Sequence, residues 1–125
     1  MNKLTNLLKE MGDEIPGLSA TAIVGMDGLQ VAQYATATKF DIEIAAAQFA
    51  LIMKSVQKTC DQLGESGVED TLITTANSYL MTLFLGDGSY YLVVAVDKNS
   101  GNLGNLRLIA RQFANVFWDA IPKKK

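Results

Sequence analysis

The segment from residue 41 to residue 63 carries more apolar side chains than one face of a helix can hold. Apolar residues recur there at helical spacing, which predicts a helix whose core-facing stripe consists of Ile42, Ala45, Phe49, Ile52 or Met53, Val56, Cys60 and Leu63. Further apolar residues flank this stripe: Ile44, Ala47 and Leu51 on one side, and Ala46, Ala50 and Met53 on the other. The first half of the helix is therefore apolar nearly all round, so either its own fold or another chain must cover it.

Shorter periodic segments precede this helix. Leucines at helical spacing predict a helix over residues 4–11, which Pro16-Gly17 separates from an apolar strand at 18–25. Asp27-Gly28 then predicts a hairpin turn into a second strand at 29–35, because this pair readily adopts the positive φ angles that a tight antiparallel turn needs. Thr38 or Asp41 can cap the start of the long helix.

The second half of the chain predicts three strands and a last helix. The strand-like runs are VEDTLITT at 68–75, YLMTLFL at 79–85 and YYLVVAV at 90–96, with turn residues between them. Apolar residues at helical spacing then predict a helix over 103–121, with Asn102 as its N-cap and Pro122 at its end.

This order of elements indicates an α+β fold, with a five-stranded antiparallel sheet and helices on both of its faces. The run at 90–96 is apolar on both sides and should be central, whereas the polar run at 68–75 suits an edge, where a partner can add a strand. A length of 125 residues favours one domain spanning 1–125. Because such a chain is too small to surround a long helix, the excess apolar surface favours association with another chain.

Charge and composition exclude several classes of protein. The net charge is −2, so no basic footprint for nucleic acid exists, and the lysines at 123–125 are best interpreted as a solvated tail. The apolar runs are too short for a membrane span, and the first eleven residues lack the continuous apolar region of a signal peptide. A single cysteine cannot form an internal disulfide. We therefore expect a cytoplasmic protein.

No motif for catalysis, cofactor binding or metal binding is found. The chain has no histidine, which excludes Ser-His and Cys-His nucleophiles and the common histidine-bearing zinc sites, and it has no phosphate-binding glycine motif. Arg107 and Arg111 lie one helical turn apart, and an ion pair with a neighbouring acid is a commoner role for them than an arginine finger. The sequence thus predicts a protein that is not an enzyme and that needs no cofactor or metal.

Several of these features together resemble the Roadblock domain, of the dynein light chain type. The resemblance covers nearly the whole chain and rests on the element order, Pro16-Gly17, the Asp27-Gly28-Leu29 hairpin, the alanine-rich helix, and Asn102-Leu103-Gly104 followed by Arg107. It implies a profilin-like fold and a homodimer, or a heterodimer with a paralogous chain, in which the long helices pack together and the third strands pair. It also implies a partner protein, because prokaryotic members, of the Mgl type, commonly regulate or scaffold small Ras-like GTPases.

Two sets of residues are predicted to form the interfaces. The expected dimer interface comprises Ile44, Ala47, Leu51, Ala46, Ala50 and Met53 from the long helix, with Thr71 and Ile73 from the edge strand. Lys54, Gln57, Lys58 and Asp61, polar positions on the later half of the helix, are expected to contact the partner. The predicted function is a non-enzymatic dimeric adaptor that binds a Ras-like GTPase and modulates its GTP hydrolysis. Two alternatives remain: a scaffold or motor light chain without a GTPase, and a small-ligand sensor.

Overall fold

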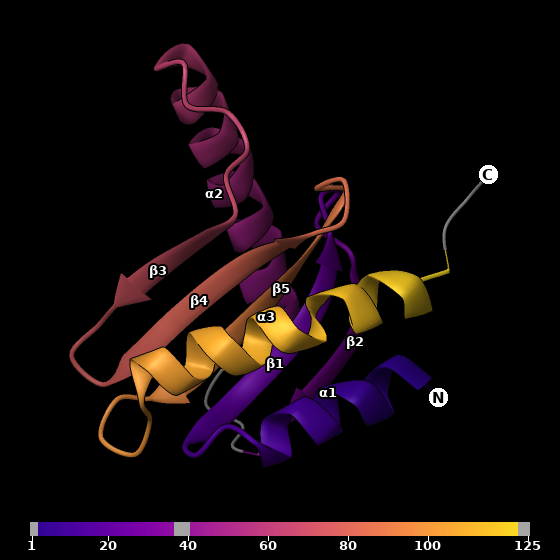
Figure 1. The fold of residues 1–125 in the computed structure, drawn as a ribbon, viewed down its shortest axis with the longest axis vertical. Helices are drawn as coiled ribbons and strands as arrows, with labels where there is room; N and C mark the ends of the chain where they lie inside the picture. Colours follow the sequence, from indigo (N-terminus) through magenta and orange to yellow (C-terminus); the bar gives the residue numbers. More distant parts are fainter. Residues whose placement is uncertain (1–2, 37–40, 123–125) are drawn as a thin grey trace.

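The computed structural model describes residues 3–36 and 41–122 and contains three helices and five strands (Figure 1). In chain order these are α1 (Lys3–Asp13), β1 (Leu18–Gly25), β2 (Gln30–Ala35), α2 (Ile42–Gln62), β3 (Asp70–Thr74), β4 (Ser78–Leu85), β5 (Tyr90–Asp97) and α3 (Leu103–Ala120). Every predicted element is present, and strand β1 has the predicted bounds.

The strands form one antiparallel sheet in the order β2-β1-β5-β4-β3. Strand β5 is central and buried on both sides, and β3 lies at an edge, as its polar composition predicted. The expected α+β fold, a five-stranded antiparallel sheet with helices on both faces, is confirmed.

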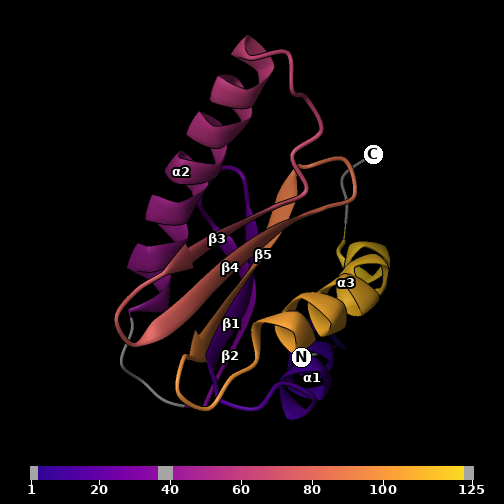
Figure 2. The same cartoon turned by 60° about the vertical axis from the view of Figure 1, so that its left-hand side comes forward.

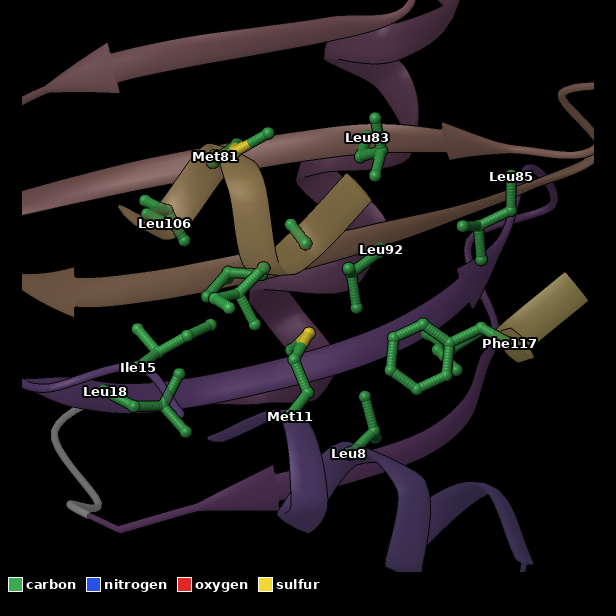
Figure 3. Packing of buried hydrophobic residues seen from close by; sticks show 14 of the residues in the cluster. Leu8, Met11, Ile15, Leu18, Met81, Leu83, Leu85, Leu92, Leu106 and Phe117 are labelled. Carbon is green, nitrogen blue, oxygen red and sulfur yellow. The ribbon is translucent and has the colours of Figure 1, made fainter. Parts of the chain in front are cut away.

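Helices α1 and α3 cover one face of the sheet, and α2 covers the other (Figures 1 and 2). The larger core lies under α1 and α3, where Leu8, Met11 and Phe117 are fully buried against Leu92 of the sheet (Figure 3). A smaller core lies under α2. Its buried members are Ala22, Val24, Ala46, Ala50, Met53 and Tyr91.

Side-chain caps fix the starts of the two long helices. The carboxylate of Asp41 accepts a hydrogen bond from the backbone N–H of Ile44 at 3.2 Å, and Asn102 Oδ1 accepts one from the N–H of Asn105 at 2.9 Å. These bonds satisfy backbone donors that have no partner within the first turn of a helix. Asn102 and Asp41 are thus confirmed as caps, and the alternative cap, Thr38, lies outside the described residues.

The buried line of α2 differs from the predicted stripe. Ala46, Ala50 and Met53 face the sheet, whereas Ile42, Ala45, Phe49, Val56 and Cys60 are only partly buried. The small side chains of Ala46 and Ala50 let the helix approach β1 and β2 closely, which the larger residues of the predicted stripe would prevent. The prediction that Ile52 or Met53 faces the core is right for Met53, and Ile52 is exposed.

The later half of α2 extends past the end of the sheet (Figures 1 and 2). Leu63, predicted to be in the core, is therefore 72% exposed. The chain then reverses at Gly64, whose φ of +78° favours glycine, and returns to the sheet at β3.

Candidate association surfaces

One flank of α2 borders a groove on the sheet. Helix α2 packs on β1 and β2, so β3 and β4 lie beyond it on the same face of the sheet. An apolar cavity of about 70 Å³ lies between this flank and the neighbouring strands. Its lining residues are Ile42, Ala45, Ala46 and Phe49 of α2 with Ala20, Thr21, Ala22, Leu80, Val93 and Ala95 of the sheet. We call this flank and the uncovered part of β3 and β4 the sheet groove.

The edge strand continues the sheet groove. Thr71 is paired with Thr82, whose hydroxyl lies 2.9 Å from the sulfur of Met53, so Thr71 and its alternate neighbour Ile73 face the α2 side. Ile73 is exposed, and within the described residues β3 has a strand neighbour on one side alone. Apolar side chains and unpaired backbone groups are therefore adjacent at this edge, a combination that suits pairing with another chain.

Ile44, Ala47 and Leu51 lie on the opposite flank of α2, which we call the outward flank. Ile44 and Leu51 are each 62% exposed, while Ala47 adjoins the β1–β2 turn, where a Cβ added to Gly28 would lie 3.6 Å from its Cα. The expected dimer interface is thus divided between two surfaces. Its members Ala46, Ala50 and Met53 belong to neither, because they are buried against the chain's own sheet, which corrects the prediction for these three residues.

The four predicted partner-contacting residues also separate. Lys54 and Lys58 are exposed and follow Leu51 at helical spacing, on the outward side of α2. Gln57 and Asp61 instead line a cleft of about 780 Å³ between α2 and α3. The cleft was not predicted, because it joins residues from four segments that are distant in the sequence.

Arg107 and Arg111 form ion pairs with the start of β3. Arg111 donates to Glu69 at 2.9 Å and also to Asp70, and Arg107 lies 3.7 Å from Asp70. The hydrogen bond to Glu69, together with Asp70, raises the pKa of Arg111 above its ordinary value. The prediction of ion pairing with a nearby acid is confirmed. The sequence had not identified these acids, which lie 41 and 42 residues from Arg111 along the chain.

Within residues 3–36 and 41–122, no three acidic or cysteine side chains gather closely enough to hold a metal ion. Among the helices that the structure describes, none has the length and hydropathy needed to cross a membrane.

Comparison with known proteins identifies the family. The model of the Roadblock/LC7 domain matches residues 4–95. An uncharacterized protein of Methanocaldococcus jannaschii, MJ0714, is 28% identical over 99 residues, which cover 79% of this chain and 80% of that protein. Two solved structures share the fold: Myxococcus xanthus MglB (TM-score 0.85, 16% identity, 95% of this chain and 94% of that one) and a Roadblock/LC7 domain from Streptomyces avermitilis (TM-score 0.74, 14% identity, 90% and 95%). The chain belongs to the Roadblock/LC7 domain family.

Proposed function

We propose that this chain is a non-enzymatic adaptor that forms a homodimer and binds a small Ras-like GTPase, whose GTP hydrolysis it modulates. The observation that carries this proposal is apolar surface on both sides of the buried line of α2. Ile44 and Leu51 are exposed on one flank, and half-buried Phe49 with exposed Ile52 lies on the other. A single second helix can cover one of them and leaves the other for a different protein.

The sheet groove is the surface for the second copy. Phe49 of α2 lies there beside Leu80 of β4. Exposed Ile52 follows Phe49 at helical spacing and continues the same flank, so the two residues form a strip along which another helix can pack. A two-fold axis beside β3 would place the α2 of each protomer in the groove of the other while the two β3 strands pair. Helix packing and strand pairing then bury the apolar strip and satisfy the backbone of the edge in one step.

The outward flank is the surface for the partner. Ile44, Ala47 and Leu51 form its apolar centre, and Lys54 and Lys58 lie at its border. An apolar centre with a charged rim is the usual composition of a protein interface. The Roadblock resemblance supports a Ras-like GTPase as the occupant. The adaptor would act by binding one state of the GTPase more tightly than the other, because a ligand shifts an equilibrium only by its difference in affinity.

Light scattering tests the dimer. At micromolar concentration the wild type should have twice the chain mass of 13.5 kDa. Ile52→Glu places a charge in the sheet groove and should give a monomer, whereas Ile44→Glu with Leu51→Glu, on the other flank, should leave the dimer intact. Circular dichroism checks that both variants fold. A monomeric wild type would contradict the dimer, and loss of the dimer in the double variant alone would reverse the two surfaces.

Pull-down tests the partner. The bait is the wild type or the Ile44→Glu, Leu51→Glu variant, and the prey is the Ras-like GTPase encoded nearest to this gene, loaded with GDP or with a non-hydrolysable GTP analogue. We expect binding that depends on the nucleotide and is lost in the variant. Binding that ignores the nucleotide would support the scaffold alternative, and absence of binding in both nucleotide states would contradict the proposal.

A further inference from the structure

The start of β3 is held from both faces of the sheet. On one face, the carboxylate of Asp70 contacts Arg107 and Arg111 of α3, and the Asp70 side chain is 10% exposed. On the other face, the hydroxyl of the next residue, Thr71, is hydrogen-bonded to the hydroxyl of Thr82 in β4. Because successive side chains of a strand point to opposite faces, these two adjacent residues fix the strand from both sides.

The segment that leads into β3 gives the strand little further support. Residues 63–67 are exposed, and a Cβ added to Gly64 or Gly67 would meet nothing within 4 Å. Within the described residues, β4 is the one strand beside β3, and Leu72 packs half-buried against the larger core. Edge strands with few buried contacts open locally more readily than central strands do. The ion pairs with α3 are therefore a main restraint on the start of β3.

The outer edge of β3 carries the backbone groups that a second strand needs. Thr75 donates its N–H to the carbonyl oxygen of Ser78 at 2.9 Å, and ladder bonds alternate along an antiparallel pair. The N–H and C=O groups of Asp70, Leu72 and Thr74 therefore point away from β4. Asp70 thus has its carboxylate on the side of α3 and its peptide groups at the pairing edge.

We propose that Arg107 and Arg111 are positioning residues for self-association, which hold the outer edge of β3 in the extended conformation that a second β3 strand pairs with. This inference rests on the proposed homodimer. A strand that is ordered before association loses less conformational entropy on pairing, so the dimer is tighter. Helix α3 lies on the face of the sheet opposite to α2 and the sheet groove, so the two arginines act through β3 (Figure 2).

Ionic strength should then regulate association. The side chains of Arg107 and Arg111 are 42% and 45% exposed, so salt screens their attraction to Asp70. Sodium chloride would loosen the start of β3 and weaken the dimer. Apolar contacts in the sheet groove alone would not give this dependence, because they involve no charge.

Hydrogen exchange tests the restraint in a monomeric chain. The background is Ile52→Glu, in which no second strand protects β3, and the comparison adds Arg107→Gln with Arg111→Gln. We expect the amides of Thr71 and Ile73, which face β4, to exchange faster in the arginine variant by a factor at least about tenfold larger than for amides of β5. Equal acceleration in β3 and β5 would indicate a loss of global stability alone and would overturn the inference.

Sedimentation of the full chain tests the effect on the dimer. Arg107→Gln with Arg111→Gln should raise the dimer Kd about fivefold or more at about 50 mM sodium chloride and much less at about 500 mM, where salt has already screened the pairs. Lys3→Gln with Lys9→Gln, on α1, removes the same charge away from β3 and should leave the Kd unchanged.

The outcomes separate this inference from the homodimer itself. An unchanged Kd in the arginine variant of a dimeric wild type, or an equal rise in the lysine variant, would overturn the inference and leave the homodimer standing. A monomeric wild type would instead contradict the homodimer, and the role in self-association would fail with it.

Discussion

The hydroxyl of Tyr91 in β5 donates a 2.6 Å hydrogen bond to the carbonyl oxygen of Ala46 in α2, a residue 45 positions earlier in the chain. Both residues are buried, and the bond joins the central strand to the first half of the helix. It sets the height at which α2 lies over the sheet and so the position of both its apolar flanks.

Tyr91→Phe should lower the free energy of unfolding by about 1 kcal/mol, the net contribution of one such hydrogen bond. The loss is small because Ala46 O remains a helical acceptor and phenylalanine keeps the ring packing. Urea denaturation measures the change, with Tyr79→Phe as the control. A loss above about 3 kcal/mol would indicate repacking of α2 as well.

Alkaline pH should destabilise the fold through the same residue. Burial raises the pKa of the Tyr91 hydroxyl above its ordinary value of 10.0, so the folded chain retains this proton at pH values where the unfolded chain has lost it. The contribution of Tyr91 to the free energy of unfolding is therefore fully present below pH 10. It decreases above that pH, by up to about 1.4 kcal/mol per pH unit. Urea denaturation between pH 9 and pH 11 should show a shallower decline in Tyr91→Phe than in the wild type, and parallel curves would contradict this assignment.

Asp70→Asn should destabilise the chain more than Glu69→Gln. The Asp70 side chain is 10% exposed and faces both Arg107 and Arg111, whereas that of Glu69 is 70% exposed. We expect a loss of about 1–3 kcal/mol for Asp70→Asn and less than about 1 kcal/mol for Glu69→Gln. Denaturation at low and high salt gives both values. Equal effects would show that burial of Asp70 adds nothing to its ion pairs.

Gly86→Ala, in the β4–β5 turn, should lower the free energy of unfolding by about 3 kcal/mol. Gly86 has a φ of +55°, and an added Cβ would overlap the indole ring of Trp118. Gly64→Ala is the matched control, because Gly64 also has a positive φ of +78° but an added Cβ there meets nothing within 4 Å. It should cost only about 1 kcal/mol of backbone strain. Thermal melts monitored by Trp118 fluorescence compare the two, and similar losses would mean that the indole moves aside.

Local signals in the sequence determined the elements and the outline of the sheet. Asp27-Gly28 and Asn102 act over two to three residues, so their turn and cap follow from their own backbone preferences. A central strand is buried on both faces, so it has to be apolar on both. The apolar run at 90–96 therefore predicted a central strand, and the polar run at 68–75 predicted an edge strand.

The tertiary structure decided which side of α2 faces the sheet. Because the helix is apolar nearly all round, its hydrophobic periodicity does not identify which side faces the sheet. Ala46, Ala50 and Met53 were therefore predicted to lie in the dimer interface, although they are buried against the chain's own sheet. Close approach to β1 favours the small side chains on the buried side, and the bond from Tyr91 to the backbone carbonyl of Ala46 joins the helix to the sheet. The ion pairs of Asp70 with α3 and the cleft between α2 and α3 likewise depend on contacts between distant segments, which spacing along one segment cannot reveal.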